Sequence, residues 1–302
     1  MSGTQESDTV EPRWPSPPQR PLPAGACDTH THVFGPYDRF PFLQPSSYAP
    51  PLAPSDAQAA MLRQVGVARS VLVQPAPYGS DPSALLDALR CAHGSARGVA
   101  VASGNVSDAT LQGWHEAGVR GLRFTDVLDR GTGRPFAGSV STRELSQLAP
   151  RMQALGWHAQ VWAPCPDIAS IVRTFGEVGV PLVFEHMASA VVEHGVANAA
   201  FQEVLALVRG ERIWIKLDLC RVSKAIPDYD DARPFHDALV AANPSRLLWA
   251  SDWPFVRLGD AAPDVGHLID VFCDWVPDAA VQRRIFTANP AELYGFDEEP
   301  LR

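Results

Sequence analysis

The amino-acid sequence predicts an α/β fold in which eight parallel strands and their connecting helices close into a (β/α)8 TIM barrel. Its 302 residues are enough for one such barrel. Short runs rich in Val, Ile, Leu and Phe recur along the chain, as expected for strands buried on both faces of a parallel sheet. Amphipathic segments lie between these runs, and this alternation is typical of α/β proteins.

Short apolar runs mark the predicted strands: Ala26–Val33, Arg69–Gln74, Gly98–Ala102, Val119–Phe124, His158–Trp162, Pro181–Glu185, Ile213–Leu217 and Leu247–Ala250. Helical periodicity between them is clearest in Ser83–His93, Arg143–Leu155, Ile168–Val178 and Ala199–Val208. A doubly wound open sheet is the alternative fold. The chain has neither G-x-G-x-x-G after a strand nor G-x-x-x-x-G-K-[ST], so the nucleotide-binding forms of that alternative lose support.

Residues 1–24 differ in composition from the rest of the chain and predict a proline-rich N-terminal arm. Six prolines crowd this segment: Pro12, Pro15, Pro17, Pro18, Pro21 and Pro23. Because proline donates no backbone N–H and few apolar side chains are present to drive burial, we expect an extended or disordered arm. An arm that packs on a partner subunit is the alternative, so a homo-oligomer stays open. Residues 25–302 are predicted to form a single barrel domain.

The charge and composition of the chain limit which partners and which cellular compartment are compatible with the sequence. The net charge of -9 repels phosphate backbones, which argues against nucleic acid as a partner. No window of 18 continuous apolar residues and no signal peptide is visible, so we expect no membrane span and a cytoplasmic protein. The five cysteines are scattered and never form C-x-x-C, which disfavours a disulfide framework or a zinc ribbon and fits reduced thiols.

An irregular stretch, residues 35–54, directly follows the first predicted strand. It contains six prolines together with the aromatic residues Tyr37, Phe40, Phe42 and Tyr48. In a barrel, a loop at this point would lie over the catalytic face. A purely structural loop is the alternative for most of these residues.

Two histidines end the first predicted strand, in the sequence Cys27-Asp28-Thr29-His30-Thr31-His32-Val33-Phe34-Gly35-Pro36. Residues i and i+2 of a strand point to the same face, so His30 and His32 should project together. Paired imidazoles suit a metal ion or a polarised carbonyl. The H-x-H pattern alone is common by chance.

His186 and Asp252 end the sixth and eighth predicted strands. Catalytic groups of TIM barrels come from the C-terminal ends of different strands, which gives both positions their significance. An Asp between apolar neighbours needs a partner or a function. A packed histidine and a helix-capping Asp are the alternatives.

Together these residues resemble the amidohydrolase superfamily, specifically its amidohydrolase-2 branch. The resemblance covers nearly everything after the arm, including the terminal segment 285–295. His30-Thr31-His32-Val33-Phe34-Gly35-Pro36 is most similar to the families of 2-pyrone-4,6-dicarboxylate lactonases and 4-sulfomuconolactone hydrolases. The resemblance implies that His30, His32, His186 and Asp252 are the catalytic set.

The resemblance also implies substrate-binding residues. Arg123 and Arg221 would bind carboxylates, because a guanidinium offers a bidentate fork; surface ion pairs are the alternative. Tyr48 matches a substrate-contacting tyrosine of the family. Gln160, a fourth predicted substrate contact, stands where a tyrosine is expected, and the segment 74–78 lacks an expected serine. Both departures leave the particular lactone open.

The implied activity is hydrolysis of a carboxylated lactone in aromatic-compound catabolism, with Asp252 as general base. The predicted cofactor is none or one divalent ion, Zn²⁺ or Mn²⁺, held by His30, His32, His186 and Asp252. A binuclear centre is not expected, because the fourth and fifth strands offer no bridging lysine or glutamate. A metal-dependent decarboxylase of the same branch is the enzyme alternative, and a small-molecule binding protein is the non-enzyme alternative.

Overall fold

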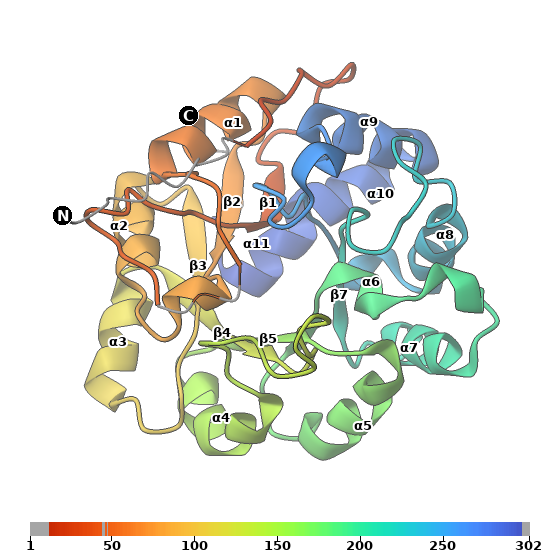
Figure 1. Ribbon diagram of the computed structural model, residues 1–302. Helices are drawn as coiled ribbons and strands as arrows, with labels where there is room; N and C mark the ends of the chain where they lie inside the picture. The colour runs from red at the N-terminus through yellow and green to blue at the C-terminus, as the bar shows by residue number, and fades with distance from the viewer. Residues whose placement is uncertain (1–11, 44–45, 47, 298–302) are drawn as a thin grey trace.

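The computed structural model describes residues 12–43, 46 and 48–297, and it contains the predicted (β/α)8 barrel (Figure 1). A sheet of eight strands runs in the order of the sequence, and every neighbouring pair is parallel. The strands are β1 (Cys27–Thr31), β2 (Arg69–Val73), β3 (Ala96–Ala100), β4 (Val119–Thr125), β5 (His158–Trp162), β6 (Leu182–Phe184), β7 (Trp214–Leu217) and β8 (Leu247–Trp249).

Most of the helices surround the strands as an outer ring (Figure 1). The helical segments are α1 (Ser55–Val65), α2 (Ser83–Cys91), α3 (Asp108–Glu116), α4 (Leu145–Ala154), α5 (Cys165–Phe175), α6 (His186–Ser189), α7 (Ala199–Arg209), α8 (Arg233–Ala242), α9 (Val265–Trp275), α10 (Ala279–Arg283) and α11 (Asn289–Tyr294). All eight predicted strands overlap observed ones. Among the strands, β3 is displaced most from its predicted position, since it begins two residues earlier. Helix α5 begins three residues before the predicted helical segment.

The barrel closes between its first and last strands. Thr31 forms a parallel bridge with Trp253, and the backbone N–H of His32 donates to the carbonyl of Trp253 at 2.9 Å. The backbone N–H of Asp252 donates to the carbonyl of His30 at 3.0 Å. Closure therefore joins the two segments that carry predicted catalytic residues, so the distance between them is set by the backbone.

The far end of the barrel is filled by side chains. Tyr294, at the end of α11, is fully buried and packs with strand residues that include Cys27, Val183 and Leu248. Figure 1 shows α11 crossing behind the centre of the ring. The ring of His158 needs a neighbouring position without a side chain, because a Cβ at Gly121 would lie 2.4 Å from its Cε1.

Lys216, on β7, lies in the barrel interior and is completely buried. Its Nζ donates to the carbonyl of Thr29 at 2.5 Å and to Oε1 of Gln160 at 2.6 Å. One side chain thereby links three strands, β1, β5 and β7. Because burial penalises the charged ammonium, the pKa of Lys216 is lowered to about 7, although the carboxylate of Glu185 opposes the shift.

The described part of the N-terminal arm, residues 12–23, lacks regular structure and is joined to the barrel along α9. The backbone N–H of Ser16 donates to the carboxylate of Asp264 at 3.0 Å, and Arg20 pairs with Asp274 at 2.8 Å. The rest of the arm, residues 1–11, lies outside the described residues. Within the described ranges, no helix combines the length and the apolar composition that crossing a bilayer would require.

We predict that Lys216→Met removes a pH-dependent part of the stability. Between about pH 7 and pH 10 the unfolded chain keeps the lysine proton that the folded chain releases, so wild-type stability should rise with pH. The difference in unfolding free energy between wild type and variant should change by about 3 kcal/mol between about pH 7 and pH 9.5. Urea unfolding at both pH values measures it. Lys224→Met, at the chain's other lysine, is the exposed control, and equal pH slopes in all three proteins would contradict the prediction.

Candidate active site

A cavity of about 510 Å³ opens at the carboxyl ends of the strands. Its polar floor contains His32, Arg123, His186, Arg221 and Asp252. Tyr48, from the aromatic segment after β1, lines its wall, so that segment does border this face of the barrel. Because active sites of (β/α)8 barrels lie at the carboxyl ends of the strands, this cavity is the candidate active site.

His30 and His32 lie side by side at the end of β1, with ring centroids 4.9 Å apart, as the spacing predicted. Nδ1 of His32 is 2.7 Å from the carbonyl oxygen of Val73. Since a carbonyl only accepts, Nδ1 carries a proton, and Nε2 is the ring nitrogen that faces Asp252. Both ring nitrogens of His30 are buried and lack a hydrogen-bond partner among the described residues.

Asp252 follows β8 and faces both imidazoles. Its Oδ1 is 3.4 Å from Nε2 of His32 and 3.6 Å from Nε2 of His30. Its Oδ2 accepts a hydrogen bond from Nε of Arg221 at 2.5 Å. Burial by itself would raise the pKa of Asp252, but the positive charge of Arg221 outweighs it and holds this pKa well below its usual range. The carboxylate is therefore ionised at neutral pH.

His186 begins a left-handed turn directly after β6. All four residues of α6 have positive φ, between 48° and 59°. Because left-handed backbone costs an L-residue roughly 1–2 kcal/mol, other contacts must hold this turn. Asp218, directly after β7, supplies them: it accepts from the backbone N–H of His186 at 3.0 Å and from its Nδ1 at 2.6 Å.

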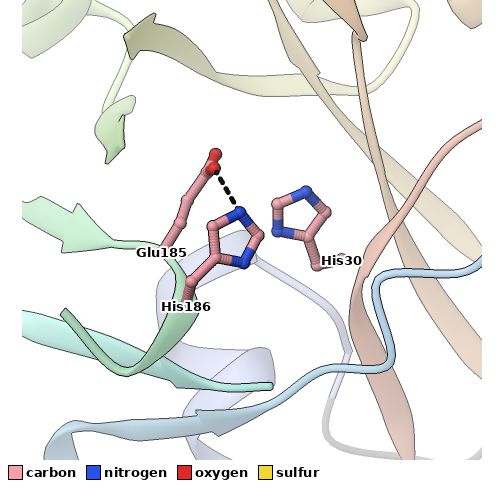
Figure 2. A group of neighbouring side chains, drawn as sticks. All are labelled: His30, Glu185 and His186. Carbon is pink, nitrogen blue, oxygen red and sulfur yellow. Dashed lines mark ion pairs between the residues drawn. The ribbon is translucent and has the colours of Figure 1, made fainter. Parts of the chain in front are cut away.

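The contact with Asp218 also decides the protonation of His186. Burial would lower the pKa of the ring, but the carboxylate of Asp218 outweighs it and raises this pKa to about 9. Since Nδ1 donates to Asp218, Nε2 is the atom left to face the rest of the site. It lies 3.3 Å from Oε2 of Glu185 (Figure 2).

Glu185 is the centre of a buried charged network beneath the floor. Arg123 donates to both of its oxygens, from Nε at 2.8 Å and from Nη2 at 2.7 Å. Nε2 of Gln160 donates to Oε1 of Glu185 at 2.5 Å, and Oε1 of Gln160 accepts from Lys216. Burial tends to raise the pKa of Glu185, but Arg123 dominates and holds this pKa well below its usual range.

A second carboxylate network braces the segment that carries Asp252. Asp28 is completely buried and accepts hydrogen bonds from the backbone N–H of Ser251 at 3.0 Å and from its Oγ at 2.5 Å. Asp28 also accepts from the backbone N–H of His30 at 3.1 Å. Its contacts therefore tie the histidine segment to the Asp252 segment. Burial raises the pKa of Asp28 to about 7, although the hydrogen bonds of Ser251 oppose the shift.

The donor atoms of His30, His32 and Asp252 fit one divalent cation. They form a buried group of potential ligands whose atoms lie within 4.8 Å of one another. Two atoms that each lie about 2.0–2.1 Å from a tetrahedral ion are about 3.4 Å apart, which matches the Oδ1-to-Nε2 distances of 3.4 and 3.6 Å. The orphaned nitrogens of His30 are a further sign, because buried polar groups rarely lack a partner.

The structure brings all four predicted catalytic residues together. Of the four predicted substrate contacts, three line the cavity and one does not. Tyr48, Arg123 and Arg221 line the cavity, and each arginine is already paired within the protein. Gln160 lies below the floor, fully buried, with both ends of its amide occupied by Glu185 and Lys216. Its observed contacts are therefore structural.

Sequence reasoning missed Glu185, Asp218, Lys216 and Asp28. The first two carried the signal that had singled out Asp252, since each is an acidic residue at the end of an apolar run. Asp28 lies within the motif quoted for His30 and His32, and Glu185 is the last residue of the sixth predicted strand, directly before His186. Lys216 sits inside a strand, where only its burial reveals its role.

Comparison with known proteins defines the family. The family model described as Amidohydrolase matches residues 27–296. The chain belongs to the amidohydrolase family. This amidohydrolase is 37% identical over 295 residues to a 2-pyrone-4,6-dicarboxylate hydrolase of Comamonas testosteroni, with 94% of each chain covered. It is 30% identical to a 4-sulfomuconolactone hydrolase of Rhizobium radiobacter, with 91% of each covered.

A solved structure supports the fold of this amidohydrolase. An apo protein of Agrobacterium tumefaciens superposes with a TM-score of 0.81, at 21% identity, covering 93% of this chain and 100% of the other. The predicted barrel and the predicted family resemblance are therefore both confirmed.

We predict that Arg123→Met destabilises the protein by about 3–5 kcal/mol, because it leaves the carboxylate of Glu185 buried without its partner. The double variant with Glu185→Gln should recover at least half of that loss, since the unpaired charge is then gone. Urea unfolding of the two single variants and the double variant measures the coupling. Strictly additive losses would contradict the prediction.

Proposed function

We propose that this amidohydrolase hydrolyses an anionic lactone and so opens its ring. The observation that carries the proposal is the ionised carboxylate of Asp252, held at the cavity floor opposite two imidazoles. The names of the relatives at 37% and 30% identity, both lactone or pyrone hydrolases, support this reaction over decarboxylation.

In the proposed mechanism, Asp252 acts as the general base. It takes a proton from a water molecule as that water attacks the lactone carbonyl. The bond between the carbonyl carbon and the ring oxygen then breaks, and Asp252 returns the proton to the departing oxygen. The product carries a hydroxyl group and a new carboxyl group, which ionises and releases the second proton of the water to solvent. His186, oriented by Asp218 and protonated, would donate a hydrogen bond to the developing oxyanion.

Substrate charge would be recognised by the two arginines of the cavity. A guanidinium carries five N–H groups. Arg221 uses its Nε toward Asp252 and one N–H of Nη1 toward Val256. Arg123 uses its Nε and one N–H of Nη2 toward Glu185, and one N–H of Nη1 toward the carbonyl of Gln74. The remaining N–H groups can bind a substrate carboxylate without breaking either ion pair. Tyr48 lines the same cavity and is a further candidate contact.

A divalent ion, Zn²⁺ or Mn²⁺, is the proposed optional cofactor, with His30, His32 and Asp252 as its ligands and His186 adjoining. When bound, such an ion would polarise the carbonyl and lower the pKa of a water molecule. A second potential group, His30 with Glu185 and His186, shares His30 with the first. Arg123 and Gln160 already occupy the oxygens of Glu185, so we propose one ion at most.

Asp252→Asn should lower kcat by at least about 10²-fold while ligand binding persists, because the base is lost and the shape is kept. Asn tolerates the positive φ of 65° at this position, so the variant should fold. Steady-state kinetics on a carboxylated 2-pyrone, with circular dichroism for folding, measures the effect. Asp108→Asn, at an exposed carboxylate, is the matched control. Near-normal turnover by folded Asp252→Asn would remove this residue from the mechanism.

Metal stoichiometry is the second test of the proposed site. After incubation with excess Zn²⁺ and desalting, the protein should retain no more than one equivalent by elemental analysis. His30→Ala should reduce the retained metal, whereas His93→Ala, at an exposed histidine, should not. Retention of two equivalents would refute the single-ion site, and equal retention by His30→Ala would refute the ligand set.

A further inference from the structure

The cavity has an apolar outer half that the reaction itself does not require. Above the polar floor, its wall is mostly apolar and includes Val127, Leu128, Phe136, Trp162, Val191 and Leu258, with the exposed Arg130 and Arg257 among them. These side chains come from the segment after β4, from the end of β5, from the chain beyond α6 and from the segment after β8. A small dianionic ring held on the floor would leave most of this wall without a partner.

An aromatic surface leads from the catalytic floor toward the mouth. The rings of Trp162 and His186 meet edge to face, with centroids 5.2 Å apart. On the other side of Trp162, the ring of Phe136 stacks at 5.4 Å with an interplanar angle of 24°. Flat aromatic surfaces favour contact with another planar ring, in stacked or edge-to-face geometry.

The rim of this half exposes large apolar side chains. Leu128 is 50% exposed and Val191 is 41% exposed. Only three other large apolar residues in the described ranges are this exposed, Trp14, Leu43 and Ile226, and none of them lines the cavity. Single exposed apolar residues need no explanation, but two that face one cavity form a continuous surface with its wall.

The cavity is also larger than a single ring needs. A closed apolar cavity of about 150 Å³ is enough to hold benzene. The cavity here measures about 510 Å³, within the range of about 300–1,000 Å³ that is usual for larger organic ligands. The volume beyond one carboxylated ring lies mainly against the apolar side chains of the wall, although the exposed Arg130 and Arg257 also line the cavity.

We propose that the outer half of the cavity is a subsite for an apolar aromatic substituent carried by the substrate. The natural substrate would then be an aryl-substituted anionic lactone, with its carboxylate at Arg123 and Arg221 and its aryl group against Trp162 and Phe136. This inference rests on the proposed lactone hydrolysis. Continuity with the catalytic floor favours a substrate substituent over a separate partner as the occupant.

The test compares two substrates and three proteins. The substrates are a carboxylated 2-pyrone and the same pyrone bearing a phenyl group remote from its carboxylate. Wild-type kcat/KM should be at least about tenfold higher for the phenyl compound, as burial of one aromatic ring predicts. In Leu128→Ser that preference should fall at least threefold. Ile226→Ser, at an equally exposed residue outside the cavity, should keep the wild-type preference.

Binding is measured in parallel by calorimetry with the corresponding lactams, which the proposed reaction does not readily open. If both pyrones are hydrolysed with no preference for phenyl, the subsite is refuted and lactone hydrolysis stands. If neither pyrone is hydrolysed but the phenyl lactam binds at least tenfold tighter, with that gain reduced in Leu128→Ser, the proposed reaction fails and the subsite stands. If there is neither turnover nor a phenyl gain in binding, both are overturned.

Discussion

The buried ion pair between Arg123 and Glu185 is the interaction on which the catalytic floor depends. Glu185 immediately precedes His186. Because Arg123 holds the carboxylate of Glu185 in place, it also fixes the point at which the left-handed turn begins. Gln160 and Lys216 extend this network across the barrel to β1, where the paired histidines start. A charge removed anywhere along it would leave another charge buried without compensation, which is far more costly than the net value of the pair.

The predictable part of this protein follows from periodicity. Short buried strands are recognisable in the sequence as apolar runs. The two-residue repeat of a strand was enough to place His30 beside His32. The parallel topology then predicted that residues from different strands meet at one site, because the carboxyl ends of all strands in a parallel barrel face the same way. His186 and Asp252 could therefore be assigned to one site although 66 residues separate them in the sequence.

The remainder was not predictable because it depends on partners that sequence order does not reveal. An arginine at the end of a barrel strand suggests a free cation, yet Arg123 pairs with Glu185 and Arg221 pairs with Asp252. The positive φ values of α6 are not predicted by residue propensity, since Met, Ala and Ser disfavour that conformation. The tertiary contact of His186 with Asp218 helps to hold the turn. The pairing of Gln160 with Lys216 likewise required the barrel to be closed.

The division of the cavity into floor and rim has a consequence for how such an enzyme changes over evolutionary time. The floor is built from strand ends and buried charges, where a replacement that leaves one charge unpaired destabilises the fold. The rim, by contrast, is built from connecting segments such as the one carrying Leu128, half exposed and free of the charged network. Drift in these segments can admit new molecules to an unchanged set of reactive groups. Enzymes that descend from one ancestor can therefore come to accept different substrates while they keep the same catalytic reaction.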